Sequence, residues 1–168
     1  EESIGNLKKE AESIGLNFNE FEKKGLITFI REESKQTISI ATPIQIIKEK
    51  KIKRVILDNI MLFKYASQSE SEFRKSFLDF LFTMKETRVT LLVITPASIN
   101  NVDIEYKQQD FLFDGLILLA KIRKGSTFER VITVLKMRGQ KHMLDIFPFK
   151  IERGGIRVYT KQIPFSLK

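Results

Sequence analysis

The stretch Arg54-Val-Ile-Leu-Asp58 decides the fold. Three aliphatic residues lead without a polar interruption to a single acid, and Lys53 precedes the run. Such a run is typical of a central strand that is covered on both faces. We therefore expect a buried strand over residues 53–58. Asp58 then lies at its carboxyl end, which is the end of an open α/β sheet that faces the ligand crevice.

A long amphipathic helix and a second aliphatic strand follow. Ser69 and Glu72 form a capping box, which predicts a helix from Ser69 to Lys85. Residues 90–95 repeat the strand pattern and end before Pro96. The predicted helix has an apolar stripe at helical spacing, made of Phe73, Phe77, Phe80, Leu81 and Met84.

Shorter elements are expected before the first strand. The pattern predicts helices over residues 3–14 and 18–24 and a short strand over residues 26–30. A further helix is expected over residues 42–50, with Thr42 as its N-cap. Helices therefore alternate with strands through the first hundred residues.

Short strands separated by turn signals replace this alternation after Asp114-Gly115. Residues 97–109 are polar and without periodicity, so we expect a loop there. The expected late strands are 116–122, 130–137, 149–152 and 156–159. Together these patterns predict an α/β fold with a mixed sheet, mostly parallel at its centre and antiparallel toward the C-terminus.

Composition narrows the chemistry that this chain can carry. Its 168 residues, 42% hydrophobic and 30% charged, fit one ordinary soluble domain. The absence of cysteine excludes disulfides and thiolate metal sites, and a single histidine argues against a histidine-based metal site. No apolar run is long enough to span a membrane, and no signal peptide is visible, so we expect the cytoplasm.

The net charge of +8 is concentrated in the last third of the chain. Residues 121–168 carry 12 Lys and Arg against 3 Asp and Glu. This asymmetry suggests a polyanionic partner, either a nucleotide or a nucleic acid. A solvated basic face would give the same count, so both interpretations stay open.

Several residues are candidates for phosphate chemistry. Asp58 can hold Mg²⁺ directly or through water, although an acid after a strand is commonly only a turn residue. Lys136 and Arg138 end a run of β-forming residues and, by alternation, project from one face of the strand. Two such cations can stabilise a transferring phosphoryl group, or they can simply face water. His142 follows in a loop and can contact a phosphate or serve a structural hydrogen bond.

These segments together resemble the KaiC-like domains of the RecA-type P-loop ATPase superfamily. The resemblance covers nearly the whole chain. It rests on Glu1-Glu2-Ser3, Ser13-Ile-Gly-Leu-Asn17, Arg54-Val-Ile-Leu-Asp58, Asp110-Phe-Leu-Phe-Asp-Gly115, Leu135-Lys-Met-Arg-Gly-Gln-Lys-His142 with Pro148-Phe149, and Gly155-Ile-Arg-Val-Tyr159. The Lys-Met-Arg-Gly-x-x-His segment is specific, whereas a Walker B strand alone would be a weak signal.

The resemblance implies a role for each candidate. Asp58 and its neighbour Asn59 would serve Mg²⁺ and ATP, and Glu1 and Glu2 would be the catalytic acids that activate water. Lys136 and Arg138 would reach the γ-phosphate bound by a neighbouring subunit, with His142 beside them. The active site would then form between protomers of a ring, commonly a hexamer.

Two departures from the family pattern matter. No Gly-x-x-x-x-Gly-Lys-Ser/Thr occurs in residues 1–168, so we expect a single RecA-like domain that is incomplete at its N-terminus and binds ATP poorly alone. Asn59 stands where the family usually has a hydroxyl residue. The alternative function is a catalytically inactive RecA-like module that binds nucleic acid or a protein through its basic last third.

Overall fold

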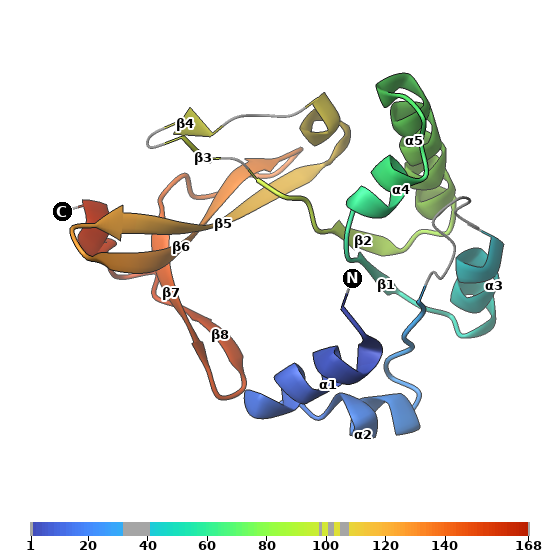
Figure 1. The fold of residues 1–168 in the computed structure, drawn as a ribbon, viewed down its shortest axis with the longest axis horizontal. Coiled ribbons are helices and arrows are strands. Elements are labelled where there is room, and N and C mark those ends of the chain that lie inside the picture. Colours follow the sequence, from blue (N-terminus) through green and yellow to red (C-terminus); the bar gives the residue numbers. More distant parts are fainter. Residues whose placement is uncertain (1, 32–40, 98, 101–102, 105–107, 168) are drawn as a thin grey trace. The chain divides into compact units, whose positions relative to one another are not determined.

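The computed structural model describes residues 2–31, 41–97, 99–100, 103–104 and 108–167. The chain divides into two compact units, each described here by itself. One unit consists of Glu1–Phe29 together with Phe113–Lys168, and we call it the sheet unit. The other consists of Ile30–Leu112, and we call it the helix unit. Figure 1 shows the elements of both with their labels.

The helix unit is built on a parallel pair of strands. β1 (Arg54–Leu57) pairs with β2 (Thr90–Val93), and the register runs from Arg54 opposite Thr90 to Leu57 opposite Val93. The remaining elements of this unit are α3 (Ala41–Glu49), α4 (Met61–Tyr65), α5 (Glu70–Glu86), β3 (Ile99–Asn100), β4 (Asp103–Ile104) and the 3₁₀ helix η1 (Gln108–Leu112). The chain thus passes from β1 through α4 and α5 to β2, which is a strand–helix–strand unit (Figure 1).

An aromatic cluster forms the core of the helix unit. The ring centroid of Phe63 on α4 lies 5.4 Å from that of Phe77 and 5.0 Å from that of Phe80, both on α5. Phe73 stacks on Phe77 one turn along the helix, at 6.0 Å. Phe77 is fully buried, and Met84 extends the buried stripe. The predicted apolar stripe of α5 is therefore confirmed, except that Leu81 is only half-buried.

The predicted capping box begins α5. The Ser69 hydroxyl accepts a hydrogen bond from the backbone N–H of Glu72 at 3.2 Å. The Glu72 carboxylate in turn accepts from the backbone N–H of Gln68 at 2.6 Å. The reciprocal bond thus reaches one residue further back than in the standard capping box. The bond to Ser69 satisfies an N–H that the first helical turn leaves without a partner, and the bond from Gln68 fixes the residue that precedes the cap.

The parallel pair of strands is covered on one face, so the expectation that both faces of the strand are buried is wrong for the described residues. Val55 and Leu57 on β1 are half-buried, but Ile56 between them is 67% exposed. Leu92 and Ile94 on the β2 side are likewise 52% and 44% exposed. Alternate side chains of a strand point to opposite faces, and the burial of the described residues shows that the helix unit covers one face of this narrow sheet.

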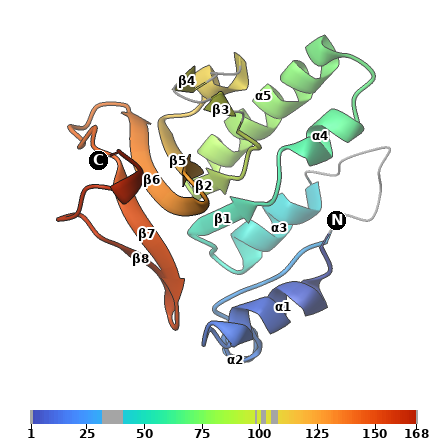
Figure 2. The same cartoon turned by 60° about the vertical axis from the view of Figure 1, so that its left-hand side comes forward.

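The sheet unit contains a four-stranded antiparallel sheet in the order β5-β6-β7-β8 (Figure 2). Its strands are β5 (Gly115–Lys124), β6 (Thr127–Met137), β7 (Phe147–Glu152) and β8 (Gly155–Val158). β5 and β6 form a long hairpin whose turn contains Gly125 at a φ of +59°. β6 and β7, by contrast, pair only through Val131 with Pro148 and Ile132 with Phe147.

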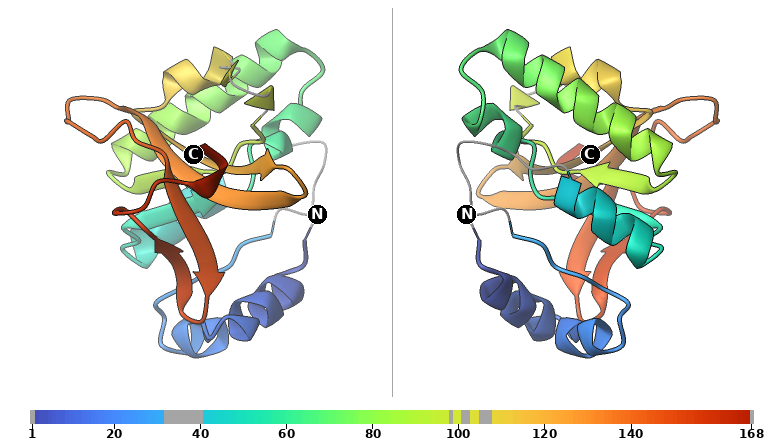
Figure 3. Two further views of the ribbon diagram at one scale, coloured as in Figure 1. Left: turned by 90° about the vertical axis from the view of Figure 1, so that its left-hand side faces the viewer. Right: turned by 90° about the vertical axis from the view of Figure 1, so that its right-hand side faces the viewer.

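Two short helices complete the sheet unit, together with the 3₁₀ helix η2 (Phe165–Leu167). α1 (Ile4–Ser13) begins at Ser3, whose hydroxyl accepts from the N–H of Asn6, as predicted. α2 (Phe18–Lys23) follows after Gly15, which has a φ of +85°. The carbonyl of Ile14 accepts a 2.6 Å hydrogen bond from the N–H of Gly154, in the turn between β7 and β8. The helix pair therefore docks at the tip of the β7–β8 hairpin (Figure 3).

Two local predictions are wrong. Residues 27–30 form no strand, because this segment is held by ring contacts instead: Phe29 lies 5.8 Å from Phe18, and the Lys8 ammonium lies 5.2 Å from the Phe29 ring centroid. Thr42 does not cap α3, because the helix already includes Ala41. The late strands are confirmed with small shifts in their ends. The expected loop contains the short pair β3–β4, and part of that loop lies outside the described residues.

The fold class is confirmed as mixed α/β, with a parallel pair and an antiparallel sheet. Among the described residues, no helix is both long enough and apolar enough to cross a membrane.

Candidate functional site

Asp58 lies directly after β1, at the carboxyl ends of the parallel strands, as predicted. Its side chain is exposed, and the Asp58–Asn59 peptide is cis. The amide oxygen of Asn59 accepts the N–H of Met61, the first residue of α4, at 2.8 Å. The N–H of Ile60 donates to the carbonyl of Ile94 at 3.1 Å. These bonds fix the backbone that follows Asp58, so the carboxylate projects from a rigid corner.

The ligands that this corner offers a metal ion are few. Among the described residues, no three His, Asp or Glu side chains cluster closely enough to form a metal site. Asp58 therefore contributes a single carboxylate. Mg²⁺ in phosphate-binding sites is commonly held by one or two carboxylates, with water and phosphate oxygens as the remaining ligands. One exposed carboxylate fits that kind of site and does not fit an all-protein metal cage.

Lys136 and Arg138 stand at the exit of β6 in the sheet unit. Lys136 is half-buried and lies opposite Leu116, whereas Arg138 is exposed and begins the turn that follows the strand. Gly139 comes next with a φ of +70°, a conformation that glycine adopts without strain and that lets the chain turn. A bulge precedes the two cations, because Leu135 has no partner on β5 between two consecutive pairs.

Asp114 holds Arg138, which the sequence had not indicated. The N–H of Arg138 donates to the Asp114 carbonyl at 2.8 Å. An Arg138 guanidinium nitrogen lies 3.3 Å from an Asp114 carboxylate oxygen. Both side chains remain more than half exposed, at 53% and 62%. The acid therefore orients the guanidinium without removing it from solvent. The Asp114-Gly115 sequence marks the start of β5, but the ion pair with Arg138 follows only from the register of β5 and β6.

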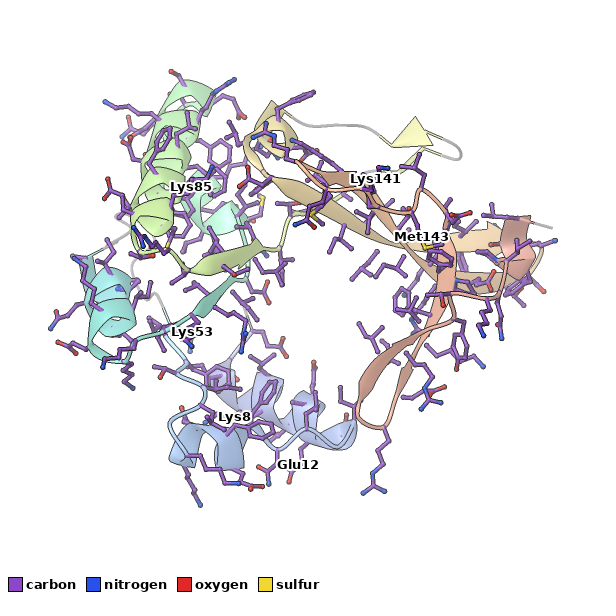
Figure 4. The ribbon with its side chains drawn as sticks, turned by 180° about the vertical axis from the view of Figure 1, so that it is seen from behind. Lys8, Glu12, Lys53, Lys85, Lys141 and Met143 are labelled. Atoms are coloured by element: carbon purple, nitrogen blue, oxygen red, sulfur yellow. The ribbon has the colours of Figure 1, made fainter. Side chains whose placement is uncertain are left out.

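His142 lies on the irregular loop after β6, between Lys141 and Met143, which Figure 4 labels. The ring is half-buried, and its Nε2 atom is buried with no hydrogen-bond partner among the described residues. A buried polar atom without a partner costs free energy, so such atoms are uncommon and often mark a ligand contact.

The structure describes one of the two acids at the start of the chain. Glu1 lies outside the described residues. Glu2 is exposed and precedes the capping residue of α1, in the sheet unit. Lys136, Arg138 and His142 belong to the same unit, whereas Asp58 and Asn59 belong to the helix unit.

A polar cluster lies on the β7–β8 hairpin. The Tyr159 hydroxyl donates to Glu152 at 2.8 Å, and Arg157 lies 3.3 Å from the other oxygen of that carboxylate. The hydrogen bond to Glu152 is the largest cause of a raised pKa at Tyr159, followed by desolvation. The Lys150 ammonium lies 5.8 Å from the Tyr159 ring centroid, within cation–π range.

Comparison with known proteins identifies the family. A sequence model of the KaiC ATPase family matches residues 1–163. The circadian clock protein KaiC3 of Synechocystis is 28% identical over 163 residues, which cover 94% of this chain and 32% of that protein. The circadian clock oscillator protein KaiC of Parathermosynechococcus lividus is 27% identical over 114 residues, which cover 67% of this chain and 21% of that protein.

A solved structure gives the same result. A KaiC-like protein from the hyperthermophilic archaeon Pyrococcus horikoshii OT3 superposes with a TM-score of 0.78 and 26% identity, over 95% of this chain and 73% of that one. The mixed α/β fold is thus that of a RecA-type domain. The chain belongs to the KaiC family of ATPases. It spans about a fifth to a third of the length of the curated relatives given above.

Proposed function

We propose that this chain is part of a KaiC-family ATPase. It would hold the Mg²⁺ of one bound nucleotide, and two of its cationic side chains would contact the nucleotide bound by a neighbouring subunit. The observation that carries the proposal is the exit of β6. There Asp114 orients the exposed guanidinium of Arg138, two residues after Lys136. A guanidinium oriented in this way and still more than half exposed is suited to an anion that arrives from outside the unit.

The family implies a nucleotide, and the residues present fit one. The buried Nε2 of His142 has no hydrogen-bond partner in the part of the chain that the structure describes, and when protonated it can donate to a phosphate oxygen. Asp58 can take one coordination position of Mg²⁺. Asn59 holds the backbone that follows that acid. ATP with Mg²⁺ supplies the phosphoryl group that is transferred to water.

The acids at the start of the chain complete the proposed site. A carboxylate of Glu1 or Glu2 would orient the attacking water and accept its proton. Lys136 and Arg138 would stabilise the negative charge that spreads over the phosphoryl oxygens in the transition state. Because these cations would act on a neighbour's nucleotide, hydrolysis would require a homo-oligomer, and we propose a ring. A cytoplasmic location stays a prediction.

The domain boundary belongs to the same proposal. The chain has no Walker A motif in its 168 residues. We propose that the phosphate cradle comes from sequence that precedes this segment in its gene. ATP hydrolysis should therefore be measured on the protein expressed with that preceding sequence.

The test is ATP turnover of that longer protein with Asp58→Asn. The amide keeps the shape of the side chain and removes the charge that attracts Mg²⁺, so we expect turnover to fall roughly 100-fold or more. Asp79→Asn is the matched control, because Asp79 is exposed on α5 and outside the proposed site. Turnover that is unchanged by Asp58→Asn would contradict the proposed role.

A catalytically inactive RecA-like module that binds nucleic acid or a protein partner is the second candidate. The concentration of positive charge in residues 121–168 favours it. An assembled longer protein that binds no ATP would support this candidate over hydrolysis.

A further inference from the structure

An open groove lies on the sheet unit where β6 and β7 diverge. The two strands separate after the pair Val131–Pro148, and β7 continues by pairing with β8 instead. The chain that follows β8 forms the opposite wall. The groove has a volume of about 710 Å³, and the lining residues that matter here are Phe128, Arg130, Lys150, Tyr159, Lys161 and Phe165.

The wall formed by the last residues is firmly held. The Glu129 carboxylate accepts from both the N–H and the hydroxyl of Ser166, each at 3.0 Å. The Lys124 ammonium donates to the carbonyl of Phe165 at 2.6 Å. Pro164 is fully buried beside them. The groove is therefore preformed, and a ligand would not have to order this segment when it binds.

Positive charge dominates the groove. Arg130, Lys150 and Lys161 are exposed, and none of the ion pairs among the described residues involves them. The groove also contains the carboxylate of Glu129, which is already engaged by Ser166. The nearby carboxylate of Glu152 is paired with Arg157. Three cations thus face solvent with little opposing charge.

Exposed aromatic rings accompany these cations. Phe128 is 65% exposed and Phe165 is 43% exposed, although large apolar side chains usually gain free energy by burial. Tyr159 also lines the groove, with the Lys150 ammonium over its ring. Aromatic faces interspersed with cations are the features that stack unpaired bases and neutralise the phosphates between them.

We propose that this groove binds single-stranded nucleic acid. A small anion without a base would contact the cations but would leave the aromatic rings without a partner. A duplex is also a poorer ligand, because its bases stack on one another and cannot stack on side chains. The groove is separate from the cations at the exit of β6. Arg130 precedes Lys136 by six residues, which is about 20 Å along a strand. The proposal does not rest on ATP hydrolysis, and its test uses this chain without nucleotide.

The first test measures fluorescence anisotropy with labelled 20-nucleotide oligo-dT and oligo-U, and with a 20-base-pair duplex. We expect both single strands to bind more tightly than the duplex. Affinity should fall with salt, with a logarithmic slope near −2 for about three phosphate contacts. Lys150→Glu with Lys161→Glu should weaken binding at least tenfold and reduce the slope by about 1.4.

The matched control is Lys9→Glu with Lys48→Glu, which makes the same change in net charge at exposed sites on α1 and α3. This control should bind nearly as the unchanged chain does. An equal loss of affinity in both double variants would overturn the proposal, because binding would then follow net charge alone. Circular dichroism of each variant checks that it is folded.

The second test removes the rings. Phe128→Ser and Phe165→Ala each leave the charge unchanged, and each should weaken single-strand binding roughly fivefold or more. Their salt slope should stay the same. Three results would overturn the proposal: no binding at low salt, a duplex bound as tightly as the single strands, or affinity that does not grow between one and five nucleotides. The last result would indicate a mononucleotide site instead.

Discussion

The two units of this chain bury their apolar residues in different ways. In the helix unit, Phe63, Phe77, Ile60 and Met84 are each no more than 2% exposed. In the sheet unit, Pro164 is the comparable residue among those described, while strand residues as large as Phe128 remain exposed. A dense aromatic core suits a unit that must hold one carboxylate in a fixed position. A thin sheet leaves cations and rings at the surface, where they can meet a partner.

The difference explains why the proposed chemistry divides between the units. Asp58 follows a strand and precedes a corner that is fixed by the hydrogen bond from Met61 to Asn59 and by a packed core. Lys136 and Arg138 lie at the end of a strand that pairs with β5, and Asp114 contacts Arg138 there. In the proposed site, the first arrangement would orient a metal ligand, and the second would present charge to a neighbouring subunit.

Removing a core ring should separate the two units most clearly. Phe77 is fully buried among three other rings, so Phe77→Ala should reduce the free energy of unfolding by about 3–5 kcal/mol. Phe128→Ala in the sheet unit should cost less than about 1 kcal/mol, because the ring is mostly in solvent. Urea unfolding followed by circular dichroism measures both. Similar losses for the two variants would remove the contrast between the units.

The pairing of Asp114 with Arg138 should matter for activity and not for stability. Both side chains are more than half exposed, so Asp114→Asn should change the free energy of unfolding by less than about 1 kcal/mol. In the longer protein, turnover should fall roughly tenfold, because the guanidinium is no longer held in position. Arg123→Ala, which removes a cation at the other end of the β5–β6 hairpin, is the control for turnover. Unchanged turnover with Asp114→Asn would show that ATP hydrolysis does not need the ion pair between Asp114 and Arg138.

Two serine substitutions test whether side-chain hydrogen bonds contribute more to the free energy of unfolding in the helix unit than in the sheet unit. Ser69→Ala leaves the N–H of Glu72 without its acceptor and should cost about 1 kcal/mol. Ser166→Ala in the sheet unit should cost less, because Glu129 keeps its bond from the backbone N–H. The comparison uses the same urea unfolding curves. A larger loss for Ser166→Ala would mean that the last residues stabilise the chain more than their exposure indicates.

The smallest expected effect concerns the phenol of Tyr159. Glu152 raises its pKa by accepting its hydrogen bond, so Glu152→Gln should lower that pKa toward the usual value for tyrosine. A raised pKa in the folded state means that the bond stabilises the fold below pH 10 and that this contribution is lost as the pH rises further. Ultraviolet titration follows the ionisation, and Tyr159→Phe identifies its transition among the three tyrosines. A pKa that Glu152→Gln leaves unchanged would exclude the charge of the Glu152 carboxylate as the cause, because the Gln amide oxygen can still accept the hydrogen bond.

The sequence predicted the elements whose signal is local. The aliphatic run before Asp58 and the capping box at Ser69 identify β1 and α5 within a residue or two, because each pattern is set by near neighbours. The ion pair between Asp114 and Arg138 could not be predicted from local patterns, because it depends on the register of β5 and β6 and on the bulge at Leu135.

The groove and the failed strand show the same limit. The groove exists because β7 leaves β6 after two pairs, which no local pattern of either strand indicates. Residues 26–30 have the composition of a strand, but Phe29 packs against Phe18 instead of entering a sheet. The unpartnered Nε2 of His142 likewise required the structure, since a histidine in a loop has no sequence signal for burial.

Subunit mixing tests the central claim most directly, namely that Lys136 and Arg138 serve the nucleotide of a neighbour. One variant of the longer protein carries Asp58→Asn, and the other carries Lys136→Ala with Arg138→Ala; each alone should be nearly inactive. If the site forms between protomers, mixed assemblies contain interfaces with every group intact, and ATP turnover should recover to a clear fraction of the unchanged protein. Turnover in the mixture that never exceeds that of either variant alone, in assemblies shown to have exchanged subunits, would contradict the claim.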